Sequence, residues 1–134
     1  MLRQVSICTQ NTKGTLQGIT QMLADKGINI WGSCTNDGAE FGIHRMIVSD
    51  PEGAMDLLKD TGHICRMTSV IGVEVEDEVG NLNRLLKALT ESNINIDYTY
   101  LSFNRDSGKP VLIFHCEDAP EVEICIKNKG FSVV

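Results

Sequence analysis

A short polar segment, Asn11-Thr12-Lys13-Gly14, lies directly before an apolar helical pattern that starts at Leu16. Glycine lets a ligand approach the backbone closely, and the N–H groups at the start of a helix attract an anion. The amide of Asn11 can both donate and accept hydrogen bonds, which suits the carboxylate and ammonium groups of an amino acid. The segment therefore predicts a binding site for a small carboxylate. The alternative is that Asn11 or Thr12 simply caps the following helix.

The same pattern occurs twice in the 134 residues of the chain, with a period of 66 positions. Two copies of one unit predict two tandem domains, residues 1–68 and residues 69–134. A domain of about 65 residues buries only about 60% of its unfolded surface and is marginally stable alone, so we expect the two domains to pack side by side. The residues that define the repeat are Gly14 and Gly80, Leu16 and Leu82, Leu23 and Leu89, and Ile28-Asn29-Ile30 and Ile94-Asn95-Ile96.

The composition limits the classes of partner. The net charge of −6 disfavours nucleic acid and anionic membrane surfaces, which bind clustered Lys and Arg. No apolar run approaches the ~20 residues of a membrane-spanning helix, and the N-terminus does not resemble a signal peptide. The five cysteines are odd in number and lack CxxC spacing, which favours free thiols in a reducing cytoplasm. We therefore expect a cytoplasmic protein without nucleic-acid or membrane partners and without a cofactor.

Alternating and helical periodicities predict the order β-α-β-β-α-β in each half. Units with this order fold as a four-stranded antiparallel sheet with both helices on one face, so the expected fold class is α+β, with two ferredoxin-like units. In the first half, we expect strands at 3–9, 28–35, 41–49 and 64–68, a helix that ends at Lys26-Gly27, a hairpin turn at Asn36-Asp37-Gly38 and a helix capped by Asp50. In the second half, we expect strands at 70–75, 94–103, 111–116 and 131–134, a helix over Leu82–Leu89, a hairpin loop at 104–109 with two extra residues, and a capping box at Asp118–Glu121.

The segment Asn11-Thr12-Lys13-Gly14-Thr15-Leu16, with Leu23 and Gly27-Ile28-Asn29-Ile30 after it, resembles the ACT domain. ACT domains are small regulatory modules that bind amino acids and control enzymes of amino-acid metabolism. Their signature is a loop of the form Asn-x-Pro-Gly-x-Leu, a helix, and a Gly-Ile-Asn-Ile strand start. Both halves match in part, so the resemblance covers nearly the whole chain and leaves no segment within it for a catalytic domain.

The resemblance implies how the domains pair and where a ligand binds. ACT domains pair along the edge strands that begin with Ile-Asn-Ile, which here implies one continuous eight-stranded antiparallel sheet with the helices on one face. The effector binds at the seam, between the first strand–helix loop of one domain and the edge strand of its neighbour. In serine-binding members a loop asparagine and the strand asparagine contact the ligand. Those positions correspond here to Asn11, Asn29 and Asn95, and the second loop has Asp77 in place of the asparagine.

We therefore expect two unequal sites. The loop of the second half contains Glu76, Asp77 and Glu78, which repel a carboxylate by ~1 kcal/mol or more per close charge. The loop of the first half is neutral to basic, so its site is expected to be the stronger one. The expected residues of the stronger site are Asn11, Thr12, Lys13, Gly14, Thr15, Leu16, Asn29, Asn95 and Asp97. The expected residues of the weaker second site are Asp77, Gly80, Asn81, Leu82 and Trp31.

Trp31, the only tryptophan, lies two residues after Asn29 and, in a regular strand, on the same face. It can line a side-chain pocket or pack at an interface, and interface packing is the more frequent role of a lone aromatic residue on an edge strand. Asp97 takes the equivalent position in the second half, so any side-chain pocket differs between the two halves.

Two groups of residues suggest other chemistry. His63 lies near Cys65, and His115-Cys116 are adjacent, but no compact ligand cluster accompanies either group, so we expect no metal site. A small ferredoxin-like enzyme that uses Cys8 or a histidine in a pocket is the main alternative function. A pocket that encloses Cys8, or a histidine with a polar partner, is the observation that favours it.

The sequence thus predicts a non-catalytic regulatory protein that binds a free amino acid. We expect it to form a homodimer, with a separate regulated enzyme as a further partner. Ligand binding is expected to stabilise one arrangement of the domains, because a regulatory output requires a partner whose affinity differs between two states.

Overall fold

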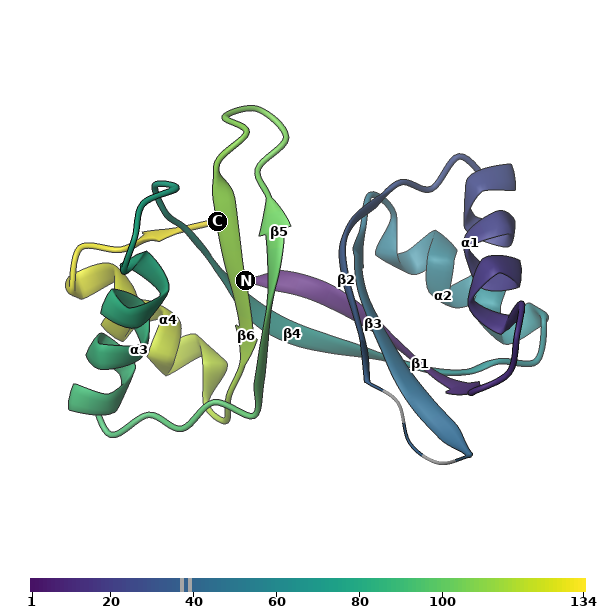
Figure 1. Ribbon diagram of the computed structural model, residues 1–134, viewed down its shortest axis with the longest axis horizontal. Coiled ribbons are helices and arrows are strands. Elements are labelled where there is room, and N and C mark those ends of the chain that lie inside the picture. The colour runs from purple at the N-terminus through teal and green to yellow at the C-terminus, as the bar shows by residue number, and fades with distance from the viewer. Residues whose placement is uncertain (37, 39) are drawn as a thin grey trace. The chain divides into compact units, whose positions relative to one another are not determined.

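The structure is a computed structural model that describes residues 1–36, 38 and 40–134 (Figure 1). The described residues form four helices and seven strands. The elements are β1 (Leu2–Gln10), α1 (Thr15–Asp25), β2 (Ile30–Asn36), β3 (Phe41–Val48), α2 (Pro51–Asp60), β4 (Ile64–Glu74), α3 (Asn81–Glu91), β5 (Tyr98–Phe103), β6 (Pro110–His115), α4 (Ala119–Asn128) and β7 (Ser132–Val133).

The chain separates into two compact units. The first-repeat unit is Arg3–Thr68, and the second-repeat unit is Ser69–Val134 together with Met1–Leu2.

Strand β4 corrects the predicted number of strands. The prediction placed a break between a strand at 64–68 and a strand at 70–75, whereas β4 runs from Ile64 to Glu74 without interruption. Only Ser69 separates the two predicted patterns, and a single serine does not end an extended backbone. The last strand of the first repeat and the first strand of the second repeat are therefore one element, and the described residues contain seven strands instead of eight.

In the first-repeat unit, β3 lies between β1 and β2 and is antiparallel to both. Helices α1 and α2 lie on the same side of these strands (Figure 1). Ile19 and Leu23 are one turn apart on α1, and both are buried in a core with Leu58 of α2 and with Val5 and Met46 of the sheet. The apolar spacing of α1 therefore directs one of its faces onto the sheet, as predicted.

Helix α1 ends in a left-handed glycine, and this shortens the strand that follows. Gly27 has φ 71°, a conformation that favours glycine. The N–H of Ile28 donates a hydrogen bond to the carbonyl oxygen of Leu23 at 2.9 Å, so Ile28 belongs to the helix cap. Strand β2 therefore begins at Ile30 and not at Ile28, where the prediction placed its start.

Strand β2 is irregular near its start. Its pairing register with β3 shifts between Ile30 and Gly32, which places a bulge at Trp31. Asn29 precedes the strand. The strict alternation that placed Asn29 and Trp31 on one strand face therefore does not extend over these two residues.

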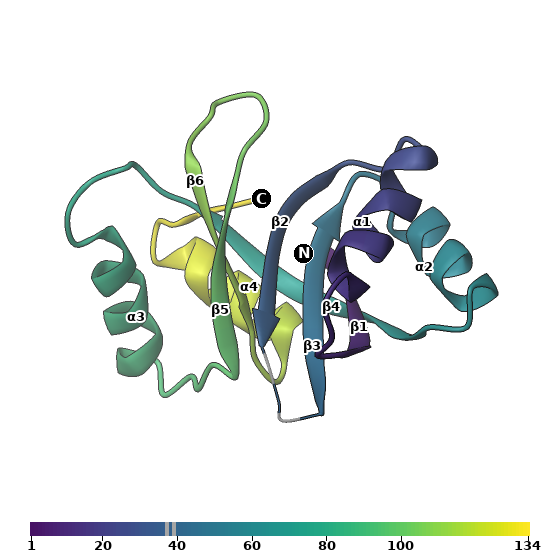
Figure 2. The same ribbon diagram turned by 45° about the vertical axis from the view of Figure 1, so that its right-hand side comes forward.

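In the second-repeat unit, β6 lies between β4 and β5 and is antiparallel to both, and β7 pairs with β4. Helices α3 and α4 lie on one side of these strands (Figure 1), and Figure 2 shows the same elements after a turn of 45°. Leu85 and Leu89 of α3 are buried in a core with Ile126 of α4 and with Ile71 and Phe114 of the sheet. The two repeats thus build the same α+β architecture from different apolar side chains.

Asn93 takes the place of glycine at the end of α3, where it has φ 56°. Asparagine tolerates this left-handed conformation better than most residues. The N–H of Ile94 donates to the carbonyl oxygen of Leu89 at 2.9 Å, which repeats the cap of α1. Strand β5 begins only at Tyr98, so Ile94-Asn95-Ile96 is a connecting segment and not the predicted strand start.

Helices α2 and α4 begin differently. Asp50 Oδ1 accepts a hydrogen bond from the N–H of Gly53 at 3.0 Å, which confirms the predicted cap of α2. Asp118 has φ 53°, and its side chain makes no capping hydrogen bond; its carbonyl oxygen accepts from the N–H of Glu121 at 2.9 Å. The predicted capping box is therefore wrong, because a side-chain cap requires an extended backbone at the cap residue.

The two hairpin loops differ in length. Six positions separate β5 from β6 and four separate β2 from β3, so the two extra residues of the second repeat lie in its hairpin loop, as predicted. The predicted turn Asn36-Asp37-Gly38 includes Asp37, which lies outside the described residues.

Candidate functional site

The loop between β1 and α1 leads into a helix that has no side-chain cap. Gly14 is the N-cap residue of α1, with φ 88°, and it makes no side-chain capping hydrogen bond. Thr12 Oγ1 lies 2.6 Å from Thr15 Oγ1, and the N–H of Asn11 donates to the carbonyl oxygen of Glu40 at 3.2 Å. The alternative in which Asn11 or Thr12 caps α1 through its side chain is therefore not what the structure shows. The positive end of the α1 dipole faces the loop.

A cavity of about 120 Å³ lies at this loop. It contains Asn11, Thr12, Thr15 and Leu16 of the predicted site, whereas Lys13 and Gly14 belong to the same loop but do not line the cavity. The remaining lining residues, which the sequence reasoning missed, are Thr9, Gln10, Thr35 and Gly42. Thr9 and Gln10 directly precede the loop at the end of β1, whereas the strand register brings Thr35 of β2 and Gly42 of β3 to it.

A buried histidine lies in the sheet next to this cavity. His44 pairs with Ile7 of β1 and with Thr35 of β2, and its side chain is only 3% exposed. Its Nδ1 lies 2.6 Å from Thr35 Oγ1, and its Nε2 has no hydrogen-bond partner among the described residues. Burial lowers the pKa of His44, because the interior disfavours the charged imidazolium.

Asn29 lies at the opposite end of α1 from the loop. Its N–H donates to Ser49 Oγ and its carbonyl oxygen accepts from the N–H of Ser49, both at 2.9 Å. Helix α1 has 11 residues, so Asn11 and Asn29 are separated by roughly 16 Å along the helix axis. Within the first-repeat unit, the structure therefore does not bring the two predicted asparagines together.

Asn95 and Asp97 lie in the second-repeat unit, where they line a cavity of about 590 Å³. The other residues around it are Ser92, Asn93, Ile94, Glu117, Asp118, Glu121, Val122 and Cys125. A corresponding cavity of about 360 Å³ in the first-repeat unit is lined by Lys26, Ile28, Asp50, Gly53, Asp56, Leu57 and Asp60. Carboxylates dominate both cavities, which makes them unsuitable for a ligand carboxylate, unlike the loop cavity.

His115 has a polar partner, which is one of the two observations that favour the enzyme alternative. Its Nδ1 lies 2.6 Å from Asp97 Oδ2, and its ring stacks on Tyr98 with ring centroids 5.4 Å apart. The neighbouring thiol, Cys116, is buried in the core, and burial followed by the charges of Asp97 and Asp118 raises its pKa. A buried thiol with a raised pKa is a poor nucleophile, so the histidine lacks a suitable thiolate beside it.

The other observation for an enzyme is a pocket around Cys8. Cys8 is exposed on β1 and lines none of the three cavities given above. Within the described residues, no group of three or more His, Cys, Asp and Glu side chains is placed to hold a metal ion. None of the helices within the described residues is long and apolar enough to cross a membrane.

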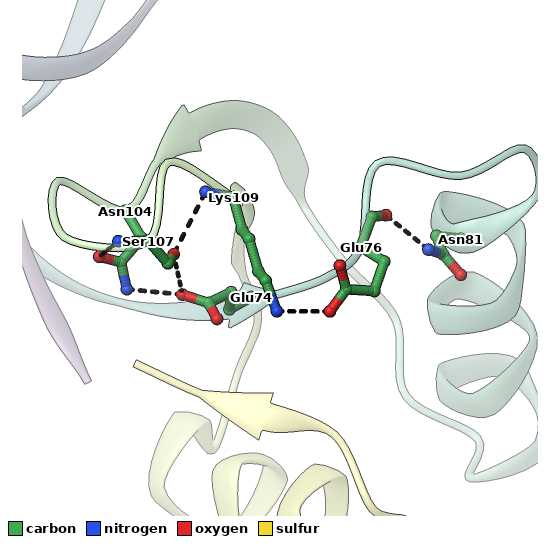
Figure 3. Close-up of polar contacts among 6 residues, drawn as sticks. All are labelled: Glu74, Glu76, Asn81, Asn104, Ser107 and Lys109. Carbon is green, nitrogen blue, oxygen red and sulfur yellow. Dashed lines mark hydrogen bonds and ion pairs between the residues drawn. The ribbon is translucent and has the colours of Figure 1, made fainter.

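The loop that precedes α3 is held by polar contacts (Figure 3). Lys109 Nζ lies 2.5 Å from Glu76 Oε1, and Asn81 Nδ2 donates to the carbonyl oxygen of Glu76 at 2.5 Å. The hydrogen bond to Glu76, together with the charges of Glu76 and Glu74, raises the pKa of Lys109. The residues of the predicted second site in this region are Asp77, Gly80, Asn81 and Leu82, whereas Trp31 belongs to β2 of the first-repeat unit.

The hairpin loop between β5 and β6 supplies Lys109 and two further polar contacts. Asn104 Nδ2 donates to Glu74 Oε2 at 2.5 Å, and Ser107 Oγ donates to the same oxygen at 3.0 Å (Figure 3). Together with Lys109, these side chains connect the longer hairpin loop to β4 and to the acidic loop. The longer hairpin loop of the second repeat therefore braces the acidic loop before α3. At the position that corresponds to Val79 of this loop, the first repeat has Lys13.

The ACT domain pair family matches residues 1–134, and the chain belongs to this family. The sequence resemblance to the ACT domain is thereby confirmed over the whole chain. A search of curated proteins found no match.

Among solved structures, the chain is similar to protein BT0572 from Bacteroides thetaiotaomicron, with a TM-score of 0.90 and 29% sequence identity over 99% of this chain and 91% of that one. It is also similar to the regulatory subunit of aspartate kinase from Thermus thermophilus in its ligand-free form, with a TM-score of 0.66, 13% identity, and coverage of 94% of this chain and 91% of that one. The corresponding subunit from Thermus flavus gives a TM-score of 0.61 at 13% identity, with 94% and 90% covered. At 13% identity these two similarities show the fold alone.

Proposed function

We propose that this ACT domain pair is a non-catalytic regulatory module that binds a free amino acid. Residues 1–68 form one ACT domain and residues 69–134 the other. The family assignment supports this proposal. The match to the ACT domain pair spans residues 1–134, so no part of this span is assigned to another kind of domain.

The amino acid binds at the loop between β1 and α1. The observation that carries this proposal is the loop cavity, which places Asn11, Thr12 and Thr15 around one space at a helix start without a side-chain cap. The N–H groups of the first turn, with Gly14 as the N-cap residue, favour a carboxylate there. Lys13 in the same loop adds a positive charge, and the amide of Asn11 is able to bind the ligand ammonium.

The remaining residues of the stronger site are Asn29, Asn95 and Asp97, which belong to the segments that follow the first helix of each repeat. We propose that such a segment of a neighbouring ACT domain completes the site. This proposal uses two predictions from the sequence. One is the side-by-side pairing of the domains in one continuous sheet, and the other is a homodimer built on that pairing.

The loop before α3 is the weaker site. Glu76, Asp77 and Glu78 surround it with negative charge, and Lys109 is already engaged with Glu76. A ligand carboxylate is therefore repelled at Gly80 and Asn81, although the helix start itself resembles that of α1, with Gly80 at φ 91°.

The module acts on a separate partner protein in the cytoplasm. Ligand binding produces a regulatory output only if the partner binds the liganded and free states with different affinities. An enzyme of amino-acid metabolism is the proposed partner, by analogy with the function of ACT domains. The amino-acid sensor is favoured over an enzyme, because Cys8 and the three histidines, His44, His63 and His115, line none of the three cavities described above.

A thermal-shift panel of the twenty amino acids tests this proposal. A ligand present at 100 times its dissociation constant stabilises the folded state by ~2.7 kcal/mol, which raises the melting temperature measurably. At least one amino acid is expected to stabilise the protein. If none does, the proposed function is wrong.

A further inference from the structure

One cross-strand pair differs in chemical character between the two repeats. In the first-repeat unit, Thr35 of β2 lies opposite His44 of β3. In the second-repeat unit, Leu101 of β5 lies opposite Leu112 of β6. The two pairs occupy corresponding places, because Leu101 follows Thr35 by the 66-residue period and Leu112 follows His44 by that period plus the two extra hairpin residues.

The polar pair is not required by the fold. The second repeat builds the same hairpin with two leucines, and Leu112 belongs to its hydrophobic core. His44 is 3% exposed, and its Nε2 has no hydrogen-bond partner among the described residues. Burying an incompletely bonded polar group is unfavourable, and such groups are rare in folded proteins. The first repeat therefore has a buried polar side chain, His44, that lowers stability at a position where an apolar side chain fits.

The polar pair adjoins the loop cavity through Thr35. Thr35 lines the loop cavity, and so does Thr9, whose equivalent in the second repeat is Val75. His44 does not line the cavity, but its Nδ1 forms a hydrogen bond with Thr35 Oγ1 at 2.6 Å. The two threonines on the sheet side of this cavity are thus apolar residues in the second repeat, and they belong to the repeat whose loop carries Asn11.

The hydrogen bond between His44 and Thr35 orients the threonine hydroxyl. A neutral imidazole carries one N–H, and buried N–H groups without an acceptor are rarer than buried acceptors without a donor. Because Nε2 has no partner, the proton is best placed on Nδ1, where it is donated to Thr35 Oγ1. The hydroxyl hydrogen of Thr35 is then available to donate to a ligand in the cavity.

We propose that Thr35 is the specificity-determining residue of the loop cavity and that His44 is its positioning residue. The pair selects a small, uncharged amino acid whose side chain carries an oxygen that accepts the hydrogen bond. This inference rests on the proposed function of the same cavity. The size of the ligand follows from the cavity volume of about 120 Å³, well below the ~300 Å³ at which pockets for drug-sized ligands begin. Its neutrality follows from the lining, which consists of Thr, Gln, Asn, Leu and Gly residues.

Two pairs of amino acids test the selectivity by isothermal titration. Serine differs from alanine by an added hydroxyl group, and threonine, which matches valine in size, carries a hydroxyl where valine carries a methyl group. The wild-type protein is expected to prefer the hydroxyl-bearing member of at least one pair by about tenfold, the usual contribution of one hydrogen bond. Thr35→Val is expected to abolish that preference, whereas the conservative variant Thr35→Ser retains it.

Two variants of His44 test the positioning role. His44→Asn keeps a donor near Thr35 and is expected to retain the preference. His44→Leu copies the second repeat and is expected to abolish the preference while the free energy of unfolding stays equal or increases. A loss of both preference and stability in His44→Leu overturns the positioning role, because a residue that only supports the fold behaves in that way.

The outcomes separate this inference from the proposed function. If amino acids bind but the wild-type protein shows no preference for a hydroxyl group, or if Thr35→Val keeps that preference, the assignment of Thr35 is wrong while amino-acid binding stands. If none of the twenty amino acids binds, both are wrong.

Discussion

The ammonium nitrogen of Lys109 lies 2.5 Å from a carboxylate oxygen of Glu76, so the longer hairpin of the second repeat is paired with the acidic loop before α3. The equivalent loop of the first repeat has Lys13 in a neutral segment. The two lysines therefore differ in their surroundings: Lys109 pairs with a carboxylate of the protein itself, whereas we propose that Lys13 attracts the carboxylate of a ligand.

Replacing Lys13 with methionine is expected to weaken amino-acid binding about two- to fivefold, because one exposed charge near a ligand carboxylate contributes about 1 kcal/mol or less. Isothermal titration at low ionic strength measures this loss, which shrinks when salt is added. Lys109→Met removes the same charge and is the control; it is expected to leave the affinity of the stronger site unchanged. If Lys109→Met weakens amino-acid binding more than Lys13→Met does, the ligand binds at the loop before α3 instead.

Asn11→Ala is expected to weaken binding by about tenfold, the contribution of one or two hydrogen bonds to a ligand. The melting temperature without ligand is expected to stay within about 2 °C of wild type, because the Asn11 side chain does not cap α1. A thermal-shift titration gives both quantities. Asn128→Ala, at an exposed position on α4, is the matched control. A large drop in the melting temperature of the ligand-free variant supports a purely structural role for Asn11.

Local chemistry explains why much of the fold follows from the sequence. Leucine and isoleucine at helical spacing predicted α1 and α3, and Gly27 marked the end of α1. The start of β5 was predicted too early, because the apolar residues Ile94 and Ile96 pack on the core from a connecting segment and imitate strand alternation. Strand β4 was divided because the repeat suggested a boundary at Ser69, where the backbone needs no turn.

The candidate site was predictable only in its local part. Asn11, Thr12, Thr15 and Leu16 are close in sequence, so their glycine-linked loop identified them as a group. The role that we propose for Thr35 depends on a cross-strand pair, and a strand pattern of alternating residues gives no reason to prefer one threonine over another. His44 was missed for the same reason, since its burial and its missing partner depend on residues far along the chain.

The two aspartates that precede the second helix of each repeat are expected to contribute differently to stability. Asp50→Ala removes a side-chain cap and is expected to lower the free energy of unfolding by about 1 kcal/mol. Asp118→Gly removes no capping bond and relieves a left-handed conformation, so it is expected to leave stability unchanged or raise it by up to about 1 kcal/mol. Urea denaturation of both variants measures the difference. Equal losses contradict the asymmetry of the two caps.

The burial of His44 makes stability depend on pH in a defined direction. Its pKa in the folded state lies below the ordinary value of 6.5, so the unfolded chain binds the proton more readily. Stability is therefore greatest above pH 6.5 and decreases as the pH falls from 6.5 through the lowered pKa of the folded state. Urea midpoints measured between about pH 5 and pH 8 are expected to follow this course, and His44→Leu is expected to flatten it. His63→Gln, at a histidine outside the loop cavity, is the control for the loss of one imidazole. If the urea midpoints of His44→Leu change with pH in parallel with those of the wild type, the pH dependence comes from other groups.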